Sequence, residues 1–431
     1  MKAKFIFAHV IAIIFATFSL FALAASSADI NKISQALESD DARCSRGQCD
    51  YKQSENLIAA ALKTATVTAD RVQVTGYMAE VHRRKGEFTQ AVELGNAALR
   101  LDPGNQRVHA TLGESYSKLG QLGKARPHFA QAAAGPEAEH AMFNACRLAQ
   151  TELSIGQIDW ALRAMPQGRT TSARVASCLQ NLAVEADTKK HPRLAAAAYH
   201  LAAKAKTSDL DSWIRAMYLY AHIGENQNAG KVIVEFSKFD LDVPKQYQTM
   251  YLYAVTQAAG PADALRIIRA WQRQEPDSLW IKERLATALL ATNEAKEAEV
   301  TFKALVKEGS ERKPAYIEGL LDAFNAQRKF AESASTCQAE STSVANSTRL
   351  KVKCGEVFQI RKQCAQALPL LNQAFLAKDL GPLIGLAALA TGLCHEAASD
   401  WRAALAAYQQ APEDARIVPR IKIVQARISQ R

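Results

Sequence analysis

We first asked whether the histidines, cysteines and acidic residues fall at spacings that support catalysis or metal binding. The chain has no G-x-S-x-G elbow, no H-E-x-x-H pair and no G-x-x-x-x-G-K-[ST] loop. His395 and Glu396 are adjacent, so on a helix their side chains point in different directions. Cys354, Cys364 and Cys394 with His395 lack the close C-x-x-C or H-x-x-x-H spacing of zinc sites. We therefore predict a protein that is not an enzyme, with no metal, no cofactor and no small-molecule substrate.

The eight cysteines favour a different chemistry, which is disulfide formation. An even number of cysteines is typical of proteins in an oxidising compartment. Their order along the chain suggests four local pairs. One would close a Ser-Arg-Gly-Gln loop, and each of the other three would join one helical repeat to the next. The disulfide candidates are Cys44, Cys49, Cys146, Cys178, Cys337, Cys354, Cys364 and Cys394.

The first 24 residues have the features of a secretory signal. Lys2 and Lys4 precede an apolar run over residues 5–23, and Ala22-Leu23-Ala24 fits a cleavage site. The run is longer than most signal cores, so an uncleaved inner-membrane anchor is the alternative. We expect a periplasmic protein, anchored in the inner membrane if the signal is not cleaved.

The charge of the chain bears on its partners. Without residues 1–24 the formal net charge of +10 falls to +8, because two lysines leave with that segment and no acidic residue does. A basic surface attracts nucleic acids, anionic lipids or acidic polymers. Export makes nucleic acid the poorest of these candidates, so we predict no nucleic-acid partner.

A repeat of nearly constant length runs along most of the chain. Small residues recur at intervals of 34 to 37 residues, and four residues after each of them, except at Gly95, stands a larger apolar residue. One helical turn separates the two sets, so each helix presents a small and a large residue on one face. The small residue lets two backbones approach, and the large one fills the groove beside it. The small residues are Ala91, Ala125, Ala161, Ala195, Ala229, Ala264, Ala298, Ser333, Ala367 and Ala404.

Residues 112–132, LGESYSKLGQLGKARPHFAQA, carry this pattern most clearly, and they resemble tetratricopeptide repeats (TPR). The resemblance implies about ten partly degenerate helix-turn-helix units, an all-α fold, and an α-α superhelix (solenoid) with an extended concave surface. It assigns repeat packing to Gly86, Ala91, Ala98, Gly113, Tyr116, Gly120, Ala125, Phe129, Ala132, Ala229, Ala264, Ala298, Ala367 and Ala404.

The expected domain layout follows from the quality of the repeats. We predict a signal at 1–24, an N-terminal helical segment at 25–66 with the Cys44/Cys49 loop, two clear repeats at 67–136, and degenerate repeats at 137–412. Residues 413–431 are basic and place apolar residues at helical spacing, which suits a capping helix with one polar face. A membrane-surface contact is the alternative for this segment.

In proteins of this kind the concave surface, lined by the first helix of each repeat, binds partner peptides or helices. The predicted groove residues are Arg83, Arg84, Arg107, Lys118, Tyr218, Tyr253 and Trp280. The arginines could instead be solvated, and the tyrosines could simply pack between repeats. We therefore expect a scaffold for protein partners in the bacterial cell envelope, assisting assembly of a secretion or polysaccharide-export complex. The alternative is a glycan-binding module for peptidoglycan or acidic exopolysaccharide, which would stack on the aromatic rings.

Overall fold

The computed structural model describes residues 29–45, 49–65, 68–239, 241–309, 311–377 and 380–430. The predicted signal at 1–24 lies outside these residues. The described chain is all-α and contains no strand, so the predicted fold class is confirmed. None of its helices is both long and apolar enough to cross a bilayer. Two compact units divide after Ala254, and each is described separately below.

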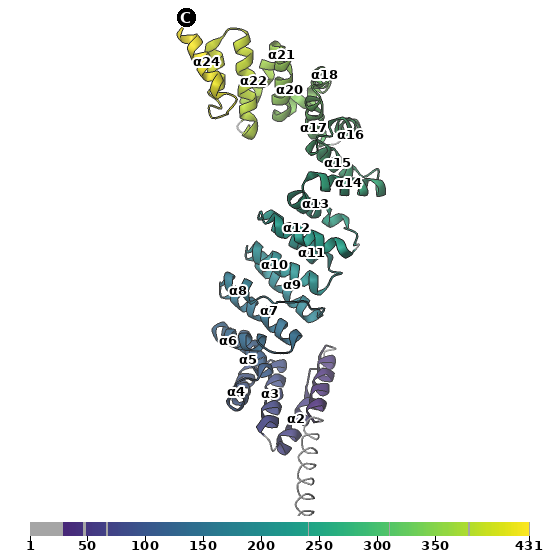
Figure 1. Ribbon diagram of the computed structural model, residues 1–431, viewed down its shortest axis with the longest axis vertical. Helices are drawn as coiled ribbons and strands as arrows, with labels where there is room; N and C mark the ends of the chain where they lie inside the picture. Colours follow the sequence, from purple (N-terminus) through teal and green to yellow (C-terminus); the bar gives the residue numbers. More distant parts are fainter. Residues whose placement is uncertain are drawn as a thin grey trace, which may run out of the picture. The chain divides into compact units, whose positions relative to one another are not determined.

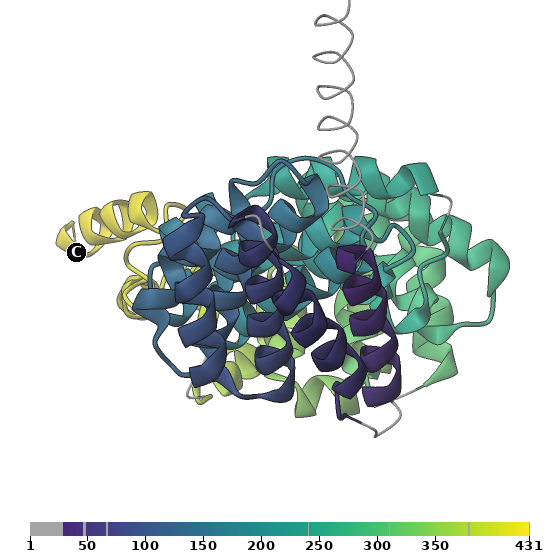
Figure 2. The same ribbon diagram turned by 90° about the horizontal axis from the view of Figure 1, so that it is seen from below.

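Unit 1 is a stack of antiparallel helix pairs (Figures 1 and 2). Residues 29–44 are helical and precede α2, and each later pair packs on the pair before it. The bounds are α2 Lys52–Thr64, α3 Thr68–Lys85, α4 Phe88–Leu101, α5 Gln106–Lys118, α6 Leu122–Ala133, α7 Ala138–Ser154, α8 Ile158–Ala164, α9 Ala173–Thr188, α10 Pro192–Ala205, α11 Leu210–His222, α12 Asn226–Phe236 and the 3-10 helix η1 Ser237–Phe239, followed by α13 Lys245–Ala259, which contains the boundary.

Unit 2 repeats the same arrangement and ends in a single helix. Ile417 and Val424 are buried against Tyr408, so α24 covers the last pair with its apolar side. The bounds are α14 Pro261–Gln274, α15 Leu279–Ala291, α16 Ala295–Glu308, α17 Lys313–Ala326, α18 Phe330–Ala339, α19 Ser341–Asn346, α20 Thr348–Ile360, α21 Cys364–Phe375, η2 Gly381–Leu383, α22 Ile384–Ala397, α23 Trp401–Tyr408 and α24 Val418–Ser429.

The small-and-large pattern sets how the two helices of a pair approach each other. Ala125 and Phe129 of α6 are fully buried, and Phe129 lies against Gly113 of α5. Leu371 lies against Gly355, and Tyr408 against Gly392, in the same way. A β-carbon added to any of these glycines would meet the facing side chain at 2.8 Å or less. The glycines are therefore required because a close approach leaves no room for a side chain.

The turn inside each pair is the second recurring feature. Five residues before the small residue of the repeat, the backbone adopts a positive φ, as at Gly120 with φ 72°; before Ala264 the positive φ is four residues earlier, at Gly260. Gly86 and Gly120 are thus exposed turn residues, whereas the other residues assigned to repeat packing are buried. Glycine adopts this conformation without strain, but other residues do not. The non-glycine residues at this position are Lys190, Asn293, Arg328, Lys362 and Ser399.

Disulfides link neighbouring pairs, and no cysteine is free among the eight, all of which are described. Cys146 of α7 bonds to Cys178 of α9. The other three bonds are Cys44–Cys49, Cys337–Cys354 and Cys364–Cys394. Each of the three longer bonds joins one helix pair to the next. The cysteines considered above as metal ligands are therefore held in disulfides.

Candidate functional site

Unit 1 contains a cavity of about 520 Å³, here called the N-terminal cavity. Its walls come from residues 29–44 and from α3, α5, α7 and α9, the first helices of four successive pairs. Three of the predicted groove residues, Arg83, Arg84 and Arg107, line it. The repeat therefore brings together side chains that are far apart in sequence.

Glu80 lies at the centre of one wall. Arg83 donates two hydrogen bonds to its carboxylate, at 2.7 and 2.6 Å, and Arg84 Nε donates a third at 2.7 Å. The Thr111 hydroxyl donates another at 3.1 Å. Burial by itself would raise the pKa of Glu80, but the two arginines outweigh it and lower the pKa from 4.5 to about 2. Glu80 is thus a fixed negative charge at neutral pH.

The same two arginines have further acidic partners. Arg83 Nη1 lies 2.6 Å from Glu114 Oε2, and Arg84 pairs with Asp41 of the N-terminal helix. Since their charges are neutralised within the protein, Arg83 and Arg84 mainly hold α3 to α5 and to residues 29–44. They are poorly placed to attract an acidic partner.

A second part of the cavity wall, formed by Arg107, Arg174 and His140, is less satisfied. Arg107 Nη1 donates to the Tyr77 hydroxyl at 2.5 Å, and its guanidinium lies 5.1 Å from the centre of that ring. It forms no ion pair with any carboxylate of the described residues. Arg174 is 56% exposed and lies 4.0 Å from Glu114. The Arg174 guanidinium also lies over the Phe143 ring, 3.7 Å from its centre, and neither arginine forms a close ion pair with the described residues.

His140 adds a third unsatisfied group to this wall. Its Nε2 atom is buried and has no hydrogen-bond partner within the described chain. Burial and the nearby charge of Arg174 lower the pKa of His140, so the ring is neutral at pH 7. A buried polar atom without a partner is costly, and a ligand that supplies the partner removes this cost.

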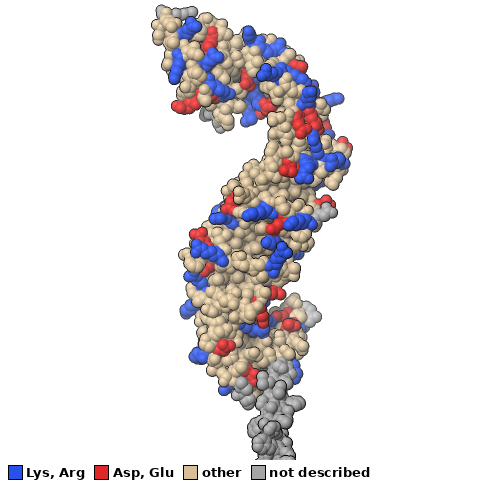
Figure 3. Space-filling view, in the orientation of Figure 1, with Lys and Arg blue, Asp and Glu red and all other residues tan. Residues whose placement is uncertain are grey.

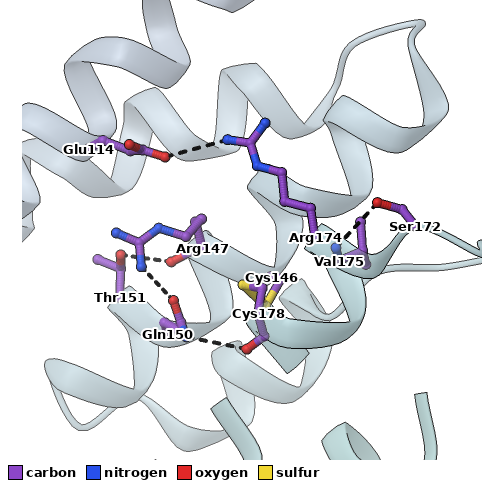
Figure 4. Close-up of a disulfide and its surroundings, with 9 residues drawn as sticks. All are labelled: Glu114, Cys146, Arg147, Gln150, Thr151, Ser172, Arg174, Val175 and Cys178. Carbon is purple, nitrogen blue, oxygen red and sulfur yellow. Dashed lines mark hydrogen bonds and ion pairs between the residues drawn. A yellow bond between two sulfur atoms is a disulfide. The ribbon is translucent and has the colours of Figure 1, made fainter. Parts of the chain in front are cut away.

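The disulfide between α7 and α9 supports this wall from beneath (Figure 4). Cys146 and Cys178 are buried, and Gln150 Nε2 donates to the Cys178 carbonyl at 3.4 Å. In Figure 4 Arg174 points from α9 toward Glu114 of α5. The covalent link fixes α7 to α9 and thereby the position of Arg174 relative to α5.

An aromatic surface lies elsewhere in unit 1, made of Tyr218, His222 and Tyr253. The Tyr218 ring stacks on His222 with centroids 5.7 Å apart and lies 5.4 Å from the Tyr253 ring. Tyr253 is 37% exposed, and His222 is exposed. The tyrosines therefore present part of their rings to solvent rather than filling the core.

The other two predicted groove residues, Lys118 and Trp280, lie in neither the N-terminal cavity nor the aromatic surface. Lys118 is exposed at the end of α5 and does not line the N-terminal cavity. Trp280 belongs to unit 2, where its ring lies 6.1 Å from Trp271 and 5.5 Å from the Arg284 guanidinium. Both stay predictions as partner-binding residues.

Sequence reasoning did not single out His140, Arg174, Tyr77 or Asp41. A signal for two of them exists in the repeat itself. His140 and Arg174 both stand 21 residues before the small residue of their repeat. Residues at one repeat position face the same side of neighbouring first helices, so this register would have placed them together.

Charge elsewhere on the described surface is mixed. On the face shown in Figure 3, Lys and Arg side chains lie beside Asp and Glu rather than in a separate basic patch. In the part of the chain that the structure describes, no group of three or more His, Cys, Asp or Glu could hold a metal ion. The N-terminal cavity is thus a site for binding through hydrogen bonds and charge.

Comparisons with known proteins found one family and several solved structures. Residues 82–135 match the tetratricopeptide repeat family. No curated protein matches the sequence. Solved structures similar to this one include the TPR domain of P58(IPK), at 14% identity over 83% of this chain and 98% of that chain with a TM-score of 0.31. Yeast Tom70 matches at 12% identity over 96% of each chain with a TM-score of 0.33.

Proposed function

We propose that this chain is a scaffold in the bacterial periplasm, because its residues 82–135 match the tetratricopeptide repeat family, whose repeats are in general non-enzymatic modules that bind proteins. It assists assembly of an envelope, secretion or polysaccharide-export complex. The N-terminal cavity receives an acidic side chain of the partner. One observation carries this proposal: Arg107, Arg174 and His140 converge on one wall without a full set of partners.

The expected interaction energies favour this wall over the rest of the cavity as the place where a carboxylate binds. A carboxylate placed between two guanidinium groups forms charge-assisted hydrogen bonds, each worth about 1.5 to 3 kcal/mol where the site excludes water. Arg83 and Arg84 offer much less, since an incoming carboxylate would compete with Glu80, Glu114 and Asp41 for the same donors. The partner is therefore held by α5, α7 and α9.

The location in the periplasm is supported by the cysteines. Four disulfides are compatible with an oxidising, exported compartment. The test is alkylation of protein taken from its native compartment without reductant. We expect no cysteine to be labelled, and labelling of most of them would overturn both the pairing and the location.

The partner is tested by crosslinking tagged full-length protein in cells, followed by affinity purification and mass spectrometry. We expect an envelope protein that is retained by the natural chain and lost from the Arg107→Gln/Arg174→Gln double variant. Arg100→Gln is the matched control, because Arg100 is exposed on α4, away from the cavity. Circular dichroism verifies that each variant folds. Equal retention by the double variant and the control would refute the role of this cavity.

The aromatic surface favours the second candidate, a glycan-binding module. Partly exposed tyrosine rings at one position of successive first helices offer faces on which sugar rings can stack. The test measures retention of the protein on purified peptidoglycan and acidic exopolysaccharide. Loss of retention in Tyr218→Ala/Tyr253→Ala, with protein partners unchanged, would support this function, and unchanged retention would exclude it.

A further inference from the structure

A second cavity of unit 1, of about 760 Å³, opens where successive helix pairs are connected. Helix α8 is only seven residues long, because Pro166 follows soon after its end at Ala164, and residues 165–172 then cross to α9. This connection forms one wall of the cavity. The other walls are the start of α7, the end of α10, part of α11 and the end of α12 with η1. We call it the loop-edge cavity, and it shares no lining residue with the N-terminal cavity.

Its interior is partly aromatic. The Trp213 side chain is only 1% exposed and is held by a hydrogen bond of 3.0 Å from its indole Nε1 to the Thr207 carbonyl. The Phe239 ring lies 5.6 Å from the Trp213 ring and is partly exposed. Met142 of α7 lines the cavity as well. Rigid aromatic rings and a flexible thioether are suited to an apolar ligand of variable shape.

Three cations line the rim, and the described residues leave them without ion pairs. Arg169, Lys204 and Lys238 line the cavity, and none of them forms an ion pair with the described residues. The two acidic residues of the rim already have partners. Glu139 accepts a hydrogen bond of 2.5 Å from the Ser172 hydroxyl, and Glu235 lies 2.9 Å from His200 Nε2.

The charge state of Glu235 bears on the net charge of the rim. Burial raises its pKa, but the hydrogen bond from His200 and the charges of Lys204 and Lys238 outweigh burial and leave the pKa below its usual value. Glu235 is therefore ionised at neutral pH and still does not neutralise the rim, because three cations face two carboxylates. The rim therefore keeps a net positive charge, which favours binding of an anion.

We propose that the loop-edge cavity binds an amphiphilic organic anion, a small molecule with an apolar body and an acidic head group. The body lies against Trp213, Met142 and Phe239, and the head group contacts Lys204 and Lys238. The cavity volume falls in the range of about 300 to 1,000 Å³ that is usual for small-ligand sites, which are mostly apolar with a few convergent polar groups. This inference does not depend on the proposed scaffold function.

Decanoate is a suitable probe, because it combines a ten-carbon chain with a carboxylate. Isothermal titration calorimetry on the full chain measures its affinity, with decanol as the uncharged analogue. We expect one decanoate per chain and binding about tenfold weaker in Lys204→Gln/Lys238→Gln, since a charge-assisted hydrogen bond is lost. Lys231→Gln is the matched control, because Lys231 is exposed on α12 and does not line the cavity.

A second measurement locates the ligand independently of affinity. A decanoate analogue carrying a photoreactive diazirine is crosslinked to the natural chain, and the labelled peptides are mapped by mass spectrometry. Labelling of the peptides that contain Met142 or Phe239 would support the proposal. Labelling spread over the chain, equal affinity for decanol, or an unchanged affinity in the double variant would overturn it.

Discussion

Replacing Gly113 by alanine tests the idea that helix pairs depend on a close approach between a glycine and a large side chain. The added β-carbon would lie 2.8, 2.9 and 3.0 Å from Cδ1, Cε1 and Cγ of Phe129. These atoms are near the base of a fully buried ring, so the ring cannot swing away. Either the ring or the α5 backbone must shift.

Two opposing energies decide the size of the effect. Overpacking a well-packed core costs about 1 to 3 kcal/mol. Alanine is about 1 kcal/mol more favourable than glycine within a helix, which offsets part of this cost. We therefore expect Gly113→Ala to lower the free energy of unfolding by about 1 kcal/mol.

The control lies in the same helix pair. Gly123 is helical and exposed, and a β-carbon there would meet nothing within 4 Å. Gly123→Ala gains helix propensity without a clash, and we expect it to raise the free energy of unfolding by about 0.5 kcal/mol.

Urea denaturation measures both variants, and amide hydrogen exchange in α5 and α6 reports the local effect, because repeat arrays open locally. We expect faster exchange in Gly113→Ala and slower exchange in Gly123→Ala. If the two substitutions changed stability in the same direction by the same amount, the close-approach argument would be refuted.

Three further predictions concern a turn, a histidine and a disulfide. Lys362→Gly should stabilise unit 2 by about 1 kcal/mol in urea denaturation, because it relieves the backbone strain of a non-glycine residue with φ 61°. An unchanged free energy of unfolding would contradict the idea that this turn is strained. Burial, aided by His109, lowers the pKa of His128 from 6.5 to about 4. The unfolded chain therefore binds the proton first, and His128 should contribute a loss of stability of about 2 kcal/mol as the pH drops from 6.5 to 4, so His128→Gln should lose about that much less than the natural chain over this range. Cys146→Ala/Cys178→Ala should cost about 3 to 4 kcal/mol, given a sequence separation of 32 between the cysteines, and added reductant should then change stability less than in the natural chain.

The fold was predictable because small and large side chains recur at fixed positions in each repeat. Ala125 and Phe129 stand one helical turn apart, and equivalent pairs recur at intervals of 34 to 37 residues. The positions of the turns were harder to predict from the sequence. Lys190 and Arg328 adopt the same positive φ as Gly120, since packing of the two helices imposes the turn whatever residue occupies it. A search for glycine alone therefore finds only some of the turns.

Two helix starts were predicted to within one residue. Because an interior proline is costly, the sequence places the starts near Gly123 and Ala365, with Pro127 and Pro369 in the first turn or at its edge. The structure begins these helices at Leu122 and Cys364, so each proline is their sixth residue. The stacking of neighbouring helices tolerates the one hydrogen bond that each proline removes.

The candidate site was only partly predictable. The sequence places Arg83, Arg84 and Arg107 on first helices, and the structure brings all three to one cavity. The sequence does not reveal which charges are already neutralised, because the partner of Arg84 is Asp41, 43 residues earlier in the chain. Pairing of this kind depends on distances between helices, which side-chain types alone do not give.

The disulfides have a mechanical consequence for a chain under tension. Stacked repeats give way one after another when the ends are pulled, because each pair is held mainly by its neighbours. The loops closed by the four bonds span 5, 32, 17 and 30 residues. At about 3.3 Å per extended residue they withhold about 280 Å of contour length. An oxidised chain would therefore reach its full extension sooner than a reduced one, and force would pass through sulfur rather than through the backbone of those helices.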